Sequence, residues 1–167
     1  QITEAKCEFL SSLEKRELPE SQCIIDISID LADAVLDSTC SVACAQDAFR
    51  ALQLMADGQY CEAIYLLELS QPTPPNAAVT MMVGHSYLKW AFETNDLILA
   101  FEDADSLDCR GESRETIWRA DYLAAAASHL QRASREAPDS PLPHYLMALV
   151  YADQGKYEKA DEECLKA

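Results

Sequence analysis

The chain has 167 residues, of which 49% are hydrophobic, and it carries a formal net charge of −16 at neutral pH. This length and composition predict one globular domain with a continuous core. So acidic a balance argues against polyanions as partners, and we expect neither nucleic acid nor an anionic membrane. The negative charge is compatible with a basic protein partner. It is equally compatible with acidic helix faces that are exposed to solvent and bind nothing.

Seven cysteines, an odd number, are spread along the chain at positions 7, 23, 40, 44, 61, 109 and 164. Most lie within apolar stripes at helical spacing, where a cysteine packs as a small hydrophobic residue. We therefore expect reduced cysteines in a cytoplasmic or nuclear protein, since disulfides are rare in those compartments. No apolar run reaches the length of about 18 residues that a transmembrane helix needs. The chain begins without methionine, which leaves a removed leader segment open.

Residues 1–43 are expected to form a pair of helices. A break at Leu18-Pro19-Glu20-Ser21 separates a first helix over residues 1–17 from a second over about residues 22–38. Residues 24–29 alternate between apolar and polar as a strand would, but a single strand has nothing to pair with, so helix is favoured. This helical pair does not share the pattern of the later segments, and we expect it to cap them.

Residues 44–76 consist of two helical runs that flank Gly58. Small or apolar side chains recur at three- and four-residue spacing on both sides of it. Gly58 stands where the chain must reverse direction, a place that favours a residue able to adopt positive φ. The run Pro72-Thr73-Pro74-Pro75 then ends the second helix. The segment is therefore a predicted helical hairpin.

Residues 77–140 follow this pattern less well. A helix is predicted from Ala77 to Trp90, with Gly84 at the small-residue place. Residues 93–96 would serve as a turn before a second helix over about residues 97–106. Residues 108–113 are a predicted loop, and residues 115–136 form a helical segment, either kinked near Asp121 or unbroken.

Residues 141–167 form the most regular predicted hairpin. Apolar residues recur at helical spacing from Tyr145 to Ala152 and, on a shorter stripe, at Tyr157, Ala160 and Cys164. Gly155 separates the two runs at the point where the chain reverses.

One turn therefore occurs twice, as Gly58-Gln59-Tyr60 and as Gly155-Lys156-Tyr157, at positions 97 residues apart. An alanine follows each tyrosine after three residues, at Ala63 and Ala160. This pattern resembles the tetratricopeptide repeat (TPR), a helical hairpin with a period of about 34 residues. Cys164 departs from it, because the family has an aromatic residue there. Three periods would span about 102 residues, so we expect a deletion of about five residues in the middle of the array.

The resemblance implies an all-α fold, an α-α superhelix in which antiparallel helical hairpins stack as a TPR-like solenoid. The repeats would be residues 44–76, 77–106, a degenerate unit over 107–140, and 141–167. The last repeat stops before its closing proline, so it is expected to be truncated, as in a chain cut from a longer array.

The sequence offers little support for catalysis or for metal binding. Cys40 and Cys44 share one helix face, but no histidine or second cysteine pair lies at zinc-finger spacing. The acidic run over residues 102–108 lacks the glycine and the terminal glutamate of a calcium loop. His85, His129 and His144 lie on separate elements, and none has a nucleophile with a local signature beside it. We therefore expect no enzyme, no catalytic residue, no cofactor and no metal site.

In TPR proteins the first helices of successive hairpins line a concave groove. Carried over by this resemblance, the groove is mainly apolar and suits an amphipathic helix or an extended apolar peptide. The type that clamps a C-terminal carboxylate is not expected, because only one groove position is basic. Leu142 belongs to the same helix face in the last repeat. The predicted partner-binding residues are Leu52, Met55, Met81, His85, Leu88, Lys89, Tyr145, Leu149 and Asp153.

Two functions follow from the resemblance. The first is a protein-protein interaction scaffold, a TPR-type subunit of a larger assembly that binds a partner helix or peptide. The alternative is a small acidic cytosolic chaperone for a hydrophobic client, of the bacterial secretion type. The expected partners are proteins, and a homo-oligomer through exposed terminal repeats is a further option. Neither function involves nucleic acid or a membrane.

Overall fold

Every segment of secondary structure in the described part of the chain is an α-helix. The computed structural model describes residues 30–35, 41–71, 75–98 and 119–167. A short helical segment over residues 30–35 precedes the labelled helices. These are α3 (Val42–Ala56), α4 (Tyr60–Leu69), α5 (Ala77–Ile98), α6 (Arg119–Glu136), α7 (Leu142–Asp153) and α8 (Tyr157–Cys164). The predicted all-α class is confirmed. Most of the predicted N-terminal cap lies outside the described residues, but residues 30–35 are helical as expected.

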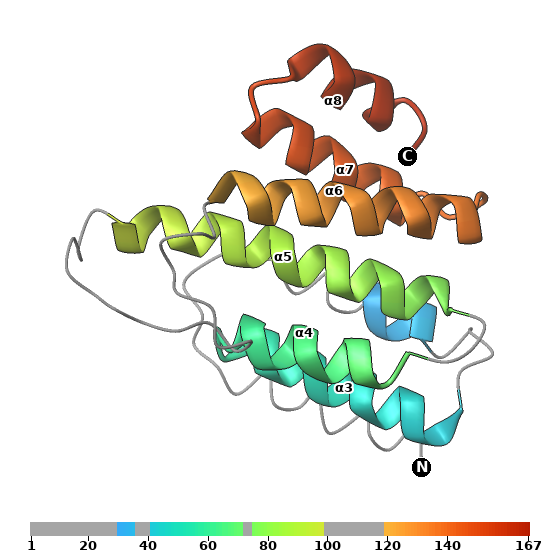
Figure 1. The fold of residues 1–167 in the computed structure, drawn as a ribbon. Coiled ribbons are helices and arrows are strands. Elements are labelled where there is room, and N and C mark those ends of the chain that lie inside the picture. The colour runs from blue at the N-terminus through green and yellow to red at the C-terminus, as the bar shows by residue number, and fades with distance from the viewer. Residues whose placement is uncertain (1–29, 36–40, 72–74, 99–118) are drawn as a thin grey trace.

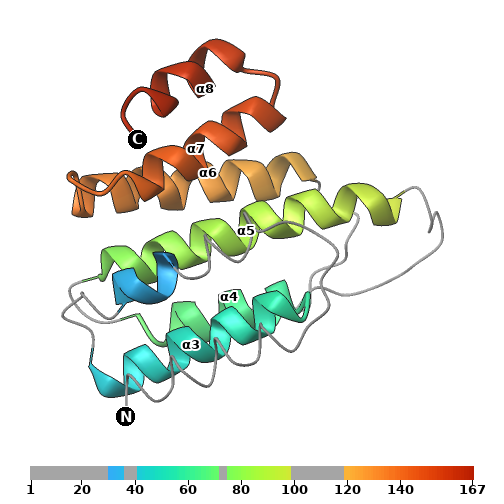
Figure 2. The ribbon, with the colours of Figure 1, turned by 180° about the vertical axis from the view of Figure 1, so that it is seen from behind.

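The labelled helices pair in chain order into hairpins that stack one on another (Figure 1). α3 packs on α4, α5 on α6 and α7 on α8, and successive hairpins meet where α4 contacts α5 and α6 contacts α7. Figure 2 shows the stack from behind, with the segment over residues 30–35 lying against α5. Leu31, Ala32 and Val35 of that segment are buried, so it is part of the hydrophobic core.

The turns of the first and last hairpins have one geometry. Gly58 and Gly155 adopt φ values of 74° and 71°. In each turn the residue after the glycine donates its N–H to the carbonyl five residues back, Gln59 to Leu54 and Lys156 to Tyr151, both at 2.8 Å. This is the Schellman helix end, which favours glycine because other residues are strained at positive φ. The prediction that the two turns are alike is confirmed.

α5 is longer than the sequence indicated. The turn predicted for residues 93–96 is wrong, because the helix continues through them to Ile98. The chain has no glycine or proline there to end a helix. The second helix predicted for residues 97–106 overlaps the end of α5, and residues 99–118 lie outside the described part.

α5 pairs with α6, although the sequence interpretation placed them in two different repeats. α6 is unbroken from Arg119 through Asp121, which agrees with the alternative that had no kink. Its buried stripe of Ala126, Leu130 and Ala133 belongs to the same core as α5. A long connection costs little more free energy than a short one, so matching surfaces decide which helices pair.

Gly84 is a point of close approach between α5 and α6. A Cβ atom at this position would lie 2.8 Å from Leu130 Cγ and 3.3 Å from the carbonyl oxygen of Ala126. Contacts this short require the Leu130 side chain, or the backbone that carries it, to shift. The glycine is therefore needed for its lack of a side chain, as its predicted small-residue place suggested.

A polar cluster joins the α4–α5 connection to α6. The hydroxyl of the fully buried Thr80 accepts hydrogen bonds from Gln71 Nε2 at 3.1 Å and from Arg132 Nη2 at 3.0 Å. It also lies 3.0 Å from the carbonyl of Asn76 and 3.1 Å from Glu136 Oε2. Arg132 Nε is 3.3 Å from the other oxygen of Glu136. The burial of the Thr80 hydroxyl is tolerated because these neighbours satisfy it.

Tyr60 and Tyr157 hold the same place in their hairpins but differ in exposure. Tyr60 is 4% exposed and donates its hydroxyl to Glu93 of α5, whereas Tyr157 is 69% exposed. α5 covers the outer face of α4, but no described helix covers that of α8. The predicted stripe of Tyr157, Ala160 and Cys164 is therefore buried at Ala160 alone.

We predict that Gly84→Ala destabilises the fold. Overpacking against Leu130 costs about 1–3 kcal/mol, which outweighs the gain of about 1 kcal/mol that alanine brings to a helix. Urea denaturation followed by circular dichroism measures the change. Leu130→Ala provides the matched control, because shortening Leu130 makes room for the new methyl group. In the double variant, Gly84→Ala should then cost less than it does alone; an equal cost in both backgrounds would contradict the close approach.

Candidate protein-binding surface

The structure buries five of the nine predicted partner-binding residues. Their side chains are at most 5% exposed, so they cannot contact a partner in this conformation. All of them except His85 belong to the hydrophobic core of the described part. The five are Leu52, Met55, Met81, His85 and Leu88.

The burial of α5 explains why its predicted partner-binding residues are not exposed. Residues 78–88 are all buried, as expected for a helix surrounded on every side. Neighbouring hairpins cover it on two sides, and the segment over residues 30–35 lies against it as well (Figure 2). The sequence held a signal for this, because residues 77–88 contain no charged residue.

The other four predicted residues remain partly exposed. Tyr145, Leu149 and Asp153 follow one another at helical spacing on α7, while Lys89 lies on α5. Tyr145 and Leu149 also pack partly against the core. Their role in partner binding stays a prediction.

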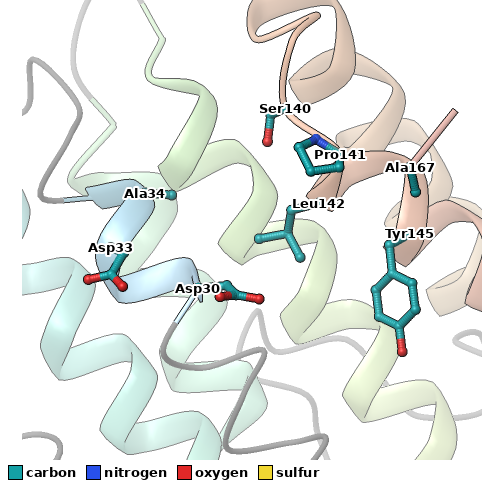
Figure 3. Close-up of a pocket in the computed structure, with 8 residues that line it drawn as sticks. All are labelled: Asp30, Asp33, Ala34, Ser140, Pro141, Leu142, Tyr145 and Ala167. Atoms are coloured by element: carbon teal, nitrogen blue, oxygen red, sulfur yellow. The ribbon is translucent and has the colours of Figure 1, made fainter.

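An open groove lies between the segment over residues 30–35 and the start of α7 (Figure 3). Its volume is about 590 Å³. One wall comes from residues 30–35, and the other from the turn that leads into α7 and from the first turns of that helix. Figure 3 shows Asp30 and Leu142 directed toward each other from these two walls. The lining residues are Asp30, Asp33, Ala34, Ser140, Pro141, Leu142, Tyr145 and Ala167.

The groove is apolar on one side and acidic on the other. Pro141, Leu142 and Tyr145 form the apolar wall, and Asp30 and Asp33 lie one helical turn apart on the facing segment. No basic side chain is among the lining residues described here. Of the predicted partner-binding residues, Tyr145 lines this groove. The two aspartates were not predicted, because nothing in the sequence places residues 30–35 opposite α7.

A second, smaller hollow of about 280 Å³ lies between α6, α7 and α8. Glu163 pairs with two of its lining residues, because its carboxylate oxygens lie 2.7 Å from His144 Nδ1 and 2.8 Å from Lys166 Nζ. Partial burial raises the pKa of the Glu163 carboxyl, but hydrogen bonds from Lys166 and His144 outweigh this and lower it. The cluster ties α8 to α7 and is part of the structure's own stabilisation.

The bonding state of two cysteines differs from the reduced state predicted from the sequence. Cys44 and Cys61 are disulfide-bonded, and Cys164 is free and exposed. Cys44 and Cys61 begin the two antiparallel helices of one hairpin, so they lie about 15 Å apart along it. Bridged cysteines have Cα atoms within about 7 Å, so each belongs to a different disulfide. The expectation of reduced cysteines is therefore wrong for these two, because spacing along a helix does not reveal pairing with distant cysteines.

The bonded state of Cys44 also removes the metal alternative considered for Cys40 and Cys44. A disulfide sulfur is not the thiolate that binds zinc. Within residues 30–35, 41–71, 75–98 and 119–167, no three His, Cys, Asp or Glu side chains gather as metal ligands would.

His85 is a buried titratable group in the centre of the fold. Its side chain is 3% exposed, and Nδ1 has no hydrogen-bond partner among the described residues. Burial, followed by the charge of Lys89, lowers the pKa of His85 to about 3. Burial and the charge of Arg132 also lower the pKa of His129. The folded chain therefore keeps both imidazoles neutral at pH 7.

Comparison with known proteins finds no matching family model, no matching curated protein and no matching solved structure. None of the helices described is long and apolar enough to cross a membrane.

We predict that the fold loses stability as the pH falls below about 6.5 and that His85 contributes to the loss. The unfolded chain binds a proton at His85 in this range, whereas the folded chain binds it only near pH 3. Each pH unit then costs at most about 1.4 kcal/mol from this group. Urea titrations from pH 7 to pH 4.5 on the parent and on His85→Gln measure it.

The variant should show the shallower pH dependence of the two. His85→Gln/His129→Gln is expected to be shallower still, since the pKa of His129 is lowered too. An identical pH dependence in the parent and His85→Gln would contradict the burial of a neutral imidazole at this position.

Proposed function

We propose that this protein is a binding module of the TPR type, which holds a protein partner on a surface built by stacked helical hairpins. The observation that carries the proposal is the repetition of one turn in two hairpins of one stack. Gly58 and Gly155 share the same positive φ, the same hydrogen bonds and the same following Tyr-x-x-Ala. Chains that repeat a hairpin in this way commonly present extended surfaces for protein partners.

The partner-binding surface of this proposal is smaller than the sequence implied. It includes the exposed parts of α7, at Tyr145 and Leu149, and the groove beside Leu142. A second surface is the outer face of α8, where Tyr157 and Leu165 are 69% and 89% exposed. That face corresponds to the face of α4 that α5 covers, so it suits a further helix, from a partner or from a second copy.

The disulfides bear on where the protein works. Two disulfide-bonded cysteines favour an oxidising compartment over the cytoplasm or nucleus, where thiols are kept reduced. They also weigh against the alternative function, a cytosolic chaperone of the bacterial secretion type. We therefore favour the interaction module, working in an oxidising environment.

The partner-binding proposal predicts site-specific cross-linking. Tyr145, replaced by the photoreactive residue p-benzoylphenylalanine, should cross-link one partner protein reproducibly in an extract of the native cells. The matched control is the same replacement at Tyr65, which is 55% exposed on α4. Mass spectrometry identifies the products. Equal products at both positions, or none at Tyr145, would remove α7 from the proposed surface.

The disulfide proposal predicts a pattern of alkylation. When the protein is trapped from its native source without a reductant, iodoacetamide should label Cys164 but neither Cys44 nor Cys61. Reduction should expose both and lower the free energy of unfolding by about 2–4 kcal/mol for each disulfide lost. Peptide mapping and denaturation measure the two effects. Full labelling of Cys44 and Cys61 before reduction would contradict the disulfides and would favour a reducing compartment instead.

A further inference from the structure

The hollow between α6, α7 and α8 differs in charge from the rest of the chain. Its lining residues include two cations, Arg135 of α6 and Lys166 just after α8, and one carboxylate, Glu163. His144 of α7 adds a further positive charge whenever it is protonated. Glu162 also attracts Lys166, so the excess positive charge is that of Arg135. The chain as a whole carries a net charge of −16.

Arg135 is the cation of this hollow that pairs with no carboxylate of the described residues. Both Lys166 and His144 contact Glu163. The Arg135 guanidinium donates from Nε to the carbonyl of Gln131 in its own helix, at 3.2 Å. A cation in the last turn of α6 is favourable because of the helix dipole, but that interaction uses neither of the two Nη groups. These groups therefore remain available to an anion.

The size and the lining of the hollow limit what can enter it. Its volume of about 280 Å³ is below the range of about 300–1,000 Å³ that is typical of pockets for drug-sized ligands. It therefore has room for a single side chain. Met147 contributes an apolar, adaptable part of the lining. A side chain with a short apolar stem and an anionic end suits this combination.

We infer that this hollow receives the side chain of a glutamate from a protein partner. The glutamate carboxylate accepts hydrogen bonds from the Nη groups of Arg135, whose guanidinium fork matches its two oxygens. The methylene groups of the glutamate pack on Met147. The net charge of the chain repels a run of acidic residues, so the glutamate is flanked by uncharged ones. This inference rests on the proposed function and adds to it the chemistry of one contact.

A nuclear magnetic resonance titration of the full chain tests the inference, because it detects even the weak binding of a small probe. The probes are a tripeptide of alanine, glutamate and alanine with both ends blocked, and the same tripeptide with glutamine in the middle. The glutamate peptide should shift the Arg135 Nε–H resonance and those of neighbouring residues on α6 and α7. The glutamine peptide should bind at least about threefold more weakly, because it lacks the charge.

Variants of Arg135 make the test specific to this side chain. Arg135→Gln should weaken binding of the glutamate peptide about three- to tenfold, and Arg135→Lys should weaken it less, because lysine keeps the charge without the fork. The matched control is Arg50→Gln, which removes an exposed arginine from α3 and should bind the peptide as the parent does. Circular dichroism checks folding. If Arg135→Gln melts early, Lys166→Gln replaces it, since it removes another cation from the hollow and should also weaken binding.

Four results would overturn the inference. Three of them are equal binding of the glutamate and glutamine peptides, no shifts at the hollow, and undiminished binding to Arg135→Gln. The fourth comes from a titration with inorganic phosphate: if phosphate binds more tightly than the glutamate peptide, the hollow is a site for small anions and not for a partner's side chain.

The outcome is separable from that of the proposed function. If Tyr145 cross-links a native partner but the glutamate peptide does not bind at the hollow, the binding module remains and the acidic contact is wrong. If the peptide binds but Tyr145 gives no cross-link, the hollow remains and the surface proposed on α7 is wrong.

Discussion

The contact of α5 with α6 at Gly84 is the constraint on which the other helices depend. The absence of a side chain at Gly84 lets Leu130 and the backbone of Ala126 come close to α5. α5 in turn contacts α3 and α4 of the first hairpin, and α6 contacts α7 of the last, so this helix pair joins the hairpins on either side of it. The polar cluster around Thr80 holds the α4–α5 connection in register with α6. If α5 and α6 moved apart, both the first and the last hairpin would lose their common support.

The central place of α5 also limits where a partner can bind. A helix whose residues 78–88 are all buried presents no groove surface of its own. The segment over residues 30–35 contributes to that core through Leu31, Ala32 and Val35. It also brings Asp30 and Asp33 opposite α7. The same segment therefore covers part of the predicted binding face on α5 and forms one wall of the groove beside α7.

Differences between equivalent positions show how context changes a repeated motif. Tyr60 is buried because α5 lies over it, and Tyr157 is exposed because no described helix does the same for α8. The two glycine turns, by contrast, are alike in both places, since their geometry depends on hydrogen bonds within a few residues. The geometry of the glycine turn is thus the same in both hairpins. The burial of the tyrosine that follows it depends on whether another helix packs over that hairpin.

The sequence by itself determined the helical class, the two Gly-x-Tyr turns and the small-residue place of Gly84, because spacing, positive φ and side-chain size act over short distances. It did not determine the pairing of α5 with α6, the burial of His85 and Met81, or the bonded state of Cys44 and Cys61. Each of these depends on residues far apart in the chain. Only the tertiary structure brings residues 30–35 to α7 and makes the groove, since two walls from distant segments leave no common pattern in the sequence.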